Sequence, residues 1–500
     1  MNEDFIGKEV SRWGDSKDMA EGTDSQVKDG FAPEIPSRNL PPVPYRDLPE
    51  PLRLRNAIGP GVILVAAGLG SGEYVLWPFI TSQVGLVFMW AAVVGVLTQT
   101  FILLEVARYT LATGETAVTG FTRLWKPWWW LFVLMAILPN AWPGFTTGAS
   151  TTLTFALGGG NVLVFTILGL IAIGLSLTLS PVVYQFLEKF QTVMVGIIII
   201  FLVLAVFLGT RAQAWGDLVT GFSNFGRIPG GIEPSALAAA VAFAGSGGAA
   251  LLVISNYIRD KQMGMGAYIP RLVSPITGQE EARAATGYMF PQNEANLARW
   301  KRWWKVTNQE QFLTFFLIGT VGIVVMSVLA YSTVFDQNVG EEFDFIRAEG
   351  EVLAEVVAPW FGTFFWLSGT VILFSTNLGN FDWVSRLTAD AVKVNWLRES
   401  EFWSESKIYA VTVWVMVTIG VLILLSGLQQ PLVLLIIAAV LNGLVMFVYS
   451  VLLIWLNRRA LPAAIKIRGL RLLVMIWAVL FFGFFSIFVI SDQVQQLFGG

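Results

Sequence analysis

The 500-residue chain contains neither cysteine nor histidine. The absence of cysteine excludes disulfides and thiolate metal sites, and the absence of histidine excludes imidazole ligands and histidine-based proton relays. No nucleophile–base pair of the usual kinds can be assembled, so we expect that the protein is not an enzyme. Any chemistry must use carboxylates, hydroxyls, amides and the backbone.

Charged residues are also scarce. They make up 13% of the chain, whereas hydrophobic residues make up 55% and the mean hydropathy is +0.64. Apolar runs long enough to cross a bilayer recur along the chain, which predicts an all-α polytopic membrane protein whose surroundings are a lipid bilayer. With a net charge of −3, nothing in the sequence supports nucleic-acid binding.

Windows of about 20 apolar residues predict about eleven transmembrane helices. They cover residues 57–80, 84–107, 128–157, 162–180, 188–209, 235–258, 309–333, 358–380, 407–426, 431–456 and 470–491. When the connecting segments are assigned to alternate sides, 29 of the 32 Lys and Arg residues fall on one side. The positive-inside rule then places the N-terminus in the cytoplasm and the C-terminus outside, and we expect a bacterial inner membrane.

Glycines interrupt two of these spans at mid-length. The first span contains Gly70-Ser71-Gly72 followed by Glu73, and the sixth contains Gly245-Ser246-Gly247. Interrupted backbone is tolerated at membrane depth only where it is buried in protein or lines a wet cavity, because hydrocarbon cannot satisfy free N–H and C=O groups. The five-span offset predicts a 5+5 inverted repeat in which both interruptions build one ion or substrate site, as is typical of transporters.

Glu73 is the main candidate residue of this site. A carboxylate at the bilayer centre costs roughly 2.5–3.5 kcal/mol on insertion scales, so its retention indicates a function. Neither interrupted span contains a basic residue, and we therefore expect Glu73 to be protonated at rest or paired with a cation. The available oxygen ligands suit hard cations such as Mg²⁺, Ca²⁺ and, less strictly, Mn²⁺.

The eighth span is unusually polar, with Ser375-Thr376-Asn377 and then Asn380. Such groups hold an ion or hydrogen-bond neighbouring helices, and the sequence leaves both roles open. Asn377 and Asn380 are weaker candidates for a metal site, and Ser375 with Thr376 is the candidate Na⁺ site. Structural ion pairs are expected at span ends between Asp382 and Arg386, Glu105 and Arg108, and Glu188 and Lys189.

Four segments also carry a family resemblance. They are residues 58–61 (Ile-Gly-Pro-Gly), 105–115 (Glu-Val-Ala-Arg-Tyr-Thr-Leu-Ala-Thr-Gly-Glu), 187–189 (Leu-Glu-Lys) and the polar eighth span. Together they resemble the Nramp family of proton-coupled divalent-metal transporters, over roughly residues 55–460. The resemblance implies a LeuT-like fold of eleven spans with broken first and sixth helices.

The chain is similar to a distant branch of that family, because its metal-binding motifs are altered. Where the family has Asp-Pro-Gly-Asn, this chain has Gly70-Ser71-Gly72-Glu73, so that Gly70 replaces the binding Asp and Glu73 the binding Asn. The Met-Pro-His segment of the family aligns with Gly247-Gly248-Ala249. At these positions the chain therefore lacks the Met thioether and the His imidazole of the family, and Glu73 is the one acid that remains.

These observations predict a secondary transporter that moves a divalent cation by alternating access, with no resident cofactor. Glu73 is the expected ligand and proton carrier, and metal binding would displace its proton. Ser71, Ser246 and carbonyls near Gly70 and Gly247 would complete the coordination.

Two other interpretations stay open. The same fold serves carriers of small organic solutes, which would be driven by Na⁺ at Ser375 and Thr376. A membrane sensor of this fold that transports nothing is the third hypothesis.

Two domains are expected. Residues 1–51 are polar and end in a Pro-rich run, which predicts a disordered cytoplasmic tail. Residues 52–500 form the transmembrane domain, with repeats at about 57–209 and 235–456 and an extra helix at about 470–491.

Overall fold

The computed structural model describes residues 30–68, 70, 72–180, 183–270, 272, 286–337, 339 and 342–498. Within these ranges every regular element is a helix, apart from isolated bridges between Phe31 and Pro44 and between Tyr45 and Met289. Eight of the described helices are long and apolar enough to cross a membrane. The chain is therefore an all-α integral membrane protein.

The predicted spans coincide with helices of the structure. In the first half these are α3 (Pro60–Gly68) with η2 (Gly72–Leu76) and α4 (Trp77–Val84), α5 (Met89–Thr113), α7 (Trp128–Asn140) with α8 (Gly144–Leu157), α9 (Val162–Leu179), and α10 (Val183–Leu204) with η4 (Ala205–Gly209). In the second half they are α12 (Pro234–Ala242) with η5 (Gly248–Val253) and α13 (Ile254–Asp260), α14 (Glu294–Gln311) with η7 (Phe312–Phe316) and α15 (Leu317–Thr333), α17 (Pro359–Asn395), α18 (Glu405–Leu425), α19 (Pro431–Arg459) and α20 (Leu470–Phe498).

Shorter helices connect the spans. They are α2 (Leu54–Ala57), η3 (Gly85–Phe88), α6 (Ala117–Leu124), α11 (Ala212–Phe222), η6 (Gly264–Tyr268) and α16 (Asp344–Val356).

Local sequence explains where many of these helices begin. Proline is the first residue of α3, α12, α17 and α19, where its missing N–H has no helical partner to lose. Side-chain oxygens cap other starts, as Asn161 does for α9 and Asn293 for α14, by accepting from backbone N–H groups at 3.1 and 2.9 Å.

The interruptions of the first and sixth spans lie where the glycines predict them, and the third span is interrupted as well. Helix α7 ends at Asn140 and α8 begins at Gly144, with Pro143 directly before it. Proline cannot donate to the preceding turn, so the helix restarts there.

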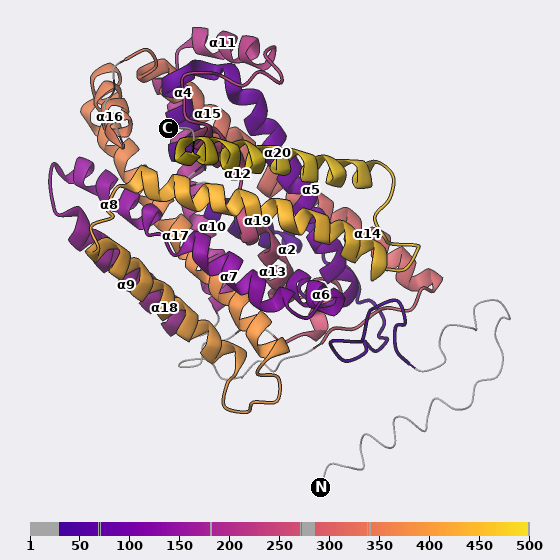
Figure 1. Ribbon diagram of the computed structural model, residues 1–500. Helices are drawn as coiled ribbons and strands as arrows, with labels where there is room; N and C mark the ends of the chain where they lie inside the picture. Colours follow the sequence, from indigo (N-terminus) through magenta and orange to yellow (C-terminus); the bar gives the residue numbers. More distant parts are fainter. Residues whose placement is uncertain are drawn as a thin grey trace.

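Helix α17 runs through the middle of the bundle and packs against α3, α7, α8, α10, α16 and α18 (Figure 1). Helices α19 and α20 lie side by side across one face, and α9 and α18 lie side by side at one edge. Helices α11 and α16 are at one end of the bundle, and α6 with the ordered N-terminal segment is at the other. This grouping matches the two sides to which the sequence assigns the connecting segments.

Residues 30–51 differ from the disordered tail that was expected, and residues 1–29 lie outside the described residues. Ala32, Ile35, Val43 and Leu48 are at most 3% exposed. Arg123 donates to the carbonyls of Pro36 and Pro41, at 2.9 Å each. The prolines favour an extended backbone with few N–H groups, so the segment can lie in a groove of the bundle and bury its apolar residues.

Two of the three predicted ion pairs form. Arg386 contacts Asp382 at 2.7 Å, and Arg108 contacts Glu105 at 2.6 Å. The third prediction was wrong, because Glu188 pairs with Lys261, which follows α13, and not with its neighbour Lys189.

Candidate functional site

The two predicted interruptions touch each other. A Cβ atom added to Gly68 would lie 2.7 Å from the carbonyl oxygen of Gly245, and one added to Gly72 would overlap the carbonyl oxygen of Phe243. Only glycine permits this approach of one backbone to the other. The structure thus brings the first and sixth spans together at mid-length, as their shared glycine pattern predicts.

Side chains satisfy the freed backbone groups of the sixth span. The amide of Gln99 on α5 accepts from the N–H of Gly247 at 3.2 Å and donates to the carbonyl of Ala242 at 3.0 Å. The hydroxyl of Ser246 donates to the carbonyl of Leu64, on the helix that leads into the first interruption. Ser246 therefore joins the two interrupted helices, and Gln99 holds the turn between α12 and η5.

The sequence interpretation missed Gln99 and Tyr449. The Tyr449 hydroxyl on α19 donates to the carbonyl of Gly248 at 2.9 Å. Gln99 is a lone amide in an apolar stretch and is fully buried, which is the signal that could have identified it.

Among the described residues, Glu73 forms no hydrogen bond to the sixth span. Its carboxylate lies toward α15, where an oxygen is 3.9 Å from the position that a Cβ on Gly319 would occupy. Val65 and Val96 approach the same position at 3.7 Å. Glu73 is 2% exposed, and neither of its oxygens has a hydrogen-bond partner in the described part of the chain.

The polar residues of α17 face different neighbours. Thr376 faces the first interruption, since a Cβ on Gly70 would overlap its side chain. Ser375 hydrogen-bonds to Gln191 on α10, and Asn377 hydrogen-bonds to Thr146 on α8. The Thr376 hydroxyl is buried and has no partner among the described residues.

Asn380 belongs to a second polar cluster. It donates to the carbonyl of Asn140 at 3.3 Å, where α7 ends. Asn442 on α19 donates to the side-chain oxygen of Asn140 at 3.1 Å and packs against Gly248. This amide cluster connects the third interruption to the sixth span.

The described residues contain no group of three or more acidic side chains that could hold a metal ion. A cation bound at the interruptions would therefore depend on Glu73 together with hydroxyl, amide and backbone oxygens. Ser71 lies outside the described residues, and its role as a ligand stays a prediction. The roles of Gly70, Gly72, Gly245, Ser246 and Gly247 as ligands stay predictions.

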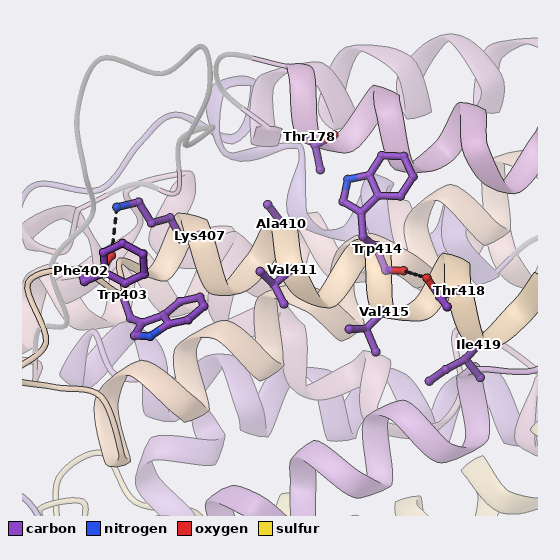
Figure 2. Close-up of a pocket in the computed structure, with 10 residues that line it drawn as sticks. All are labelled: Thr178, Phe402, Trp403, Lys407, Ala410, Val411, Trp414, Val415, Thr418 and Ile419. Carbon is purple, nitrogen blue, oxygen red and sulfur yellow. Dashed lines mark hydrogen bonds between the residues drawn. The ribbon is translucent and has the colours of Figure 1, made fainter.

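One surface pocket lies away from this site. It has a volume of about 640 Å³ and lies on the outer side of α18, beside Thr178 of α9 (Figure 2). Apolar side chains such as Val411, Trp414 and Val415 line it and are 37–50% exposed. A surface of this composition on a membrane-spanning bundle faces lipid.

No protein-family model matches this chain, and no curated protein sequence matches it. Solved structures of similar architecture include the manganese transporter of Eremococcus coleocola in complex with an aromatic bis-isothiourea substituted compound. It aligns with 14% identity and a TM-score of 0.67, over 94% of this chain and 92% of that chain. A mutant of the same transporter, with one histidine replaced by alanine, aligns with 14% identity and a TM-score of 0.66 over 89% and 88%. The likeness establishes the LeuT-like fold predicted from the sequence, and at this identity it shows the fold alone.

Proposed function

We propose that this protein is a secondary transporter that moves a hard divalent cation, such as Mn²⁺ or Mg²⁺, across a membrane by alternating access. The observation that carries the proposal is the contact between the two interrupted helices, together with the buried oxygens of Thr376 and Glu73, which have no hydrogen-bond partner among the described residues. Buried polar atoms without partners are costly, and a bound ion at the interruptions would satisfy these two groups. The manganese transporter of the same fold adds support for a metal substrate.

In this mechanism the backbone of the two interruptions supplies carbonyl oxygens, and Thr376 supplies a hydroxyl. Glu73 must turn from α15 toward the first interruption to complete the site. The π-helical turn η2, in which Glu73 lies, is a form that often occurs at functional sites. Cation binding would displace a proton from Glu73, so the same carboxylate would couple the two ions.

The test is uptake of Mn²⁺, Mg²⁺, Ca²⁺ and Zn²⁺ by purified protein in liposomes, with internal pH recorded at the same time. We expect uptake by the wild type and its loss in Glu73→Gln. Glu355→Gln, which changes an exposed acid on α16, is the matched control and should transport normally. Wild-type uptake by Glu73→Gln would overturn the role of Glu73, and no uptake of any divalent cation would overturn the metal function.

A second candidate function rests on the contact of Thr376 with Gly70. A hydroxyl on the eighth span facing unwound backbone of the first could hold Na⁺, which would drive uptake of a small organic solute. In this case Na⁺-dependent uptake of an amine or amino acid should be lost in Thr376→Val. A folded protein that transports neither metals nor solutes would favour a membrane sensor.

The proposed location is a bacterial inner membrane, with the N-terminus in the cytoplasm. It rests on the distribution of Lys and Arg residues among the connecting segments.

A further inference from the structure

A basic cavity lies away from the interrupted helices, at the end of the bundle that carries α6. It has a volume of about 410 Å³ and lies between the C-terminal part of α5, helix α14 and the α19–α20 connection. Its described lining residues are Arg108, Leu297, Trp300, Lys301, Trp304, Ala464, Ile465, Lys466, Arg468 and Arg471. Five of them are basic and none is acidic.

Two of these five residues share a single carboxylate. Glu105, which is fully buried, contacts Arg108 at 2.6 Å and Arg471 at 3.4 Å. Lys301, Lys466 and Arg468 form no ion pair within the described ranges. Most of the positive charge of the cavity is therefore not compensated by an ion pair with the described residues.

The cavity has a fixed shape, which distinguishes it from a scatter of surface charges. The rings of Trp300 and Trp304 stack with centroids 5.9 Å apart. The guanidinium groups of Arg108 and Arg471 lie 4.1 and 4.7 Å from the Trp304 ring. Arg108 is only 6% exposed and donates to the carbonyl of Ile465 at 2.8 Å. These contacts hold the two guanidinium groups in a fixed position in the wall of the cavity before any anion binds.

An apolar surface continues from the cavity toward the middle of the membrane. Phe101 and Leu97 precede Arg108 by seven and eleven residues on α5, so they share its face. The Arg471 guanidinium lies 5.6 Å from the Phe101 ring. Leu97 on α5 and Leu473 on α20 are 36% and 63% exposed. An anion that fits both surfaces carries hydrocarbon chains.

We propose that this cavity binds the phosphate group of an anionic phospholipid, whose acyl chains lie along α5 and α20. Basic pockets between transmembrane helices on the cytoplasmic side are suited to anionic headgroups, and the Lys and Arg distribution places this end in the cytoplasm. The proposal does not depend on the transported species.

The test is native mass spectrometry of the purified full-length protein with phosphatidylglycerol, phosphatidylcholine, glycerol phosphate and inorganic phosphate. We expect retained phosphatidylglycerol, little phosphatidylcholine, and no displacement of the lipid by the two water-soluble phosphates. Equal retention of both lipids would overturn the proposal. Displacement by millimolar inorganic phosphate would also overturn it, because the site would then serve a soluble anion.

Lys466→Gln combined with Arg468→Gln is the variant of choice, since neither residue is fully buried or ion-paired in the described structure and folding should not change. Each basic residue contributes about 1 kcal/mol to anionic lipid binding, so the pair should weaken phosphatidylglycerol binding by at least about tenfold. Arg458→Gln with Arg459→Gln removes the same charge from the exposed end of α19, outside this cavity. An equal loss in both double variants would indicate general surface attraction and overturn the site.

Discussion

The carboxyl group of Glu349 is buried in α16 and is 1% exposed. Neither oxygen has a hydrogen-bond partner in the described structure, and burial raises the pKa of Glu349 well above its ordinary value of 4.5. A raised folded-state pKa means that the native protein favours the neutral acid. The contribution of Glu349 to the stability of the protein is therefore fully present below pH 4.5. It is lost as the pH rises through the raised folded-state pKa.

We predict that Glu349→Gln removes this decline, because glutamine keeps the size and cannot ionise. Thermal unfolding in detergent from pH 4.5 to 9 should show a growing advantage of the variant, on the order of 1–3 kcal/mol at the upper end. Parallel curves for the two proteins would mean that Glu349 does not titrate in the native state.

Gly70 is a second residue whose environment gives a definite expectation. The Cβ of Gly70→Ala would overlap the hydroxyl and β-carbon of Thr376, so we expect a loss of about 1–3 kcal/mol of stability. Gly196→Ala on α10 is the matched control, because nothing lies within 4 Å of its added Cβ. The Gly196→Ala variant should be as stable as the wild type, or more stable by about 0.5–1 kcal/mol. Equal unfolding temperatures for the two variants would contradict the close contact at Gly70.

Among the elements, α6 and the ordered N-terminal segment depend on one buried ion pair. Arg123 contacts Glu115 at 2.6 Å, and both side chains are fully buried. Burial alone would raise the pKa of Glu115, but Arg123 and the Tyr109 hydroxyl hold it below its ordinary value. The pair therefore stabilises the fold above about pH 4.5, and this contribution is lost as the pH falls through the lowered folded-state pKa.

We predict that Arg123→Gln costs about 3–5 kcal/mol, because it leaves Glu115 charged and buried. Proteolysis should then cut the segment of residues 30–50 first, since Arg123 holds the carbonyls of Pro36 and Pro41. The double variant with Glu115→Gln should recover part of the loss. If Arg123→Gln unfolds no earlier than the exposed-site variant Arg347→Gln, the pair does not anchor the segment.

The interruptions of the helices could be predicted only in part from the sequence. Glycines at mid-span predict the interruptions of the first and sixth spans, because a residue without a Cβ atom lets two backbones come into contact. The third interruption, at Pro143, follows a second proline within α7, and proline in membrane helices is common enough that the pattern alone does not locate a break. The order of residues 30–51 was missed because it depends on the distant residue Arg123.

For the whole molecule, the distribution of Lys and Arg among the segments that connect the spans predicts which end faces the cytoplasm. The absence of cysteine allows a direct test, because a single introduced thiol is then the only one present. A membrane-impermeant maleimide should label Arg347→Cys on α16 in right-side-out vesicles, and should label Lys126→Cys only after permeabilisation. The opposite pattern would invert the topology.

The candidate site could be predicted as a location but not as a set of contacts. The glycine pairs identify where the first and sixth spans meet. The direction of Glu73 could not be predicted, because it depends on how α15 packs against η2. Likewise, the partners of Ser375 and Asn377 are Gln191 and Thr146, which lie on helices far away in the sequence.

Helix α17 is a single rod of 37 residues, and at 1.5 Å per residue it is about 55 Å long. Thr376, its contact with the first interruption, lies near its midpoint. A tilt of about 5° around this fulcrum would move Asp390, some 20 Å away, by almost 2 Å. That displacement is enough to break the ion pair of Asp390 with Arg259. A small tilt of α17 around an ion bound beside Thr376 would therefore separate charged side chains at one end of the bundle and loosen the contacts there.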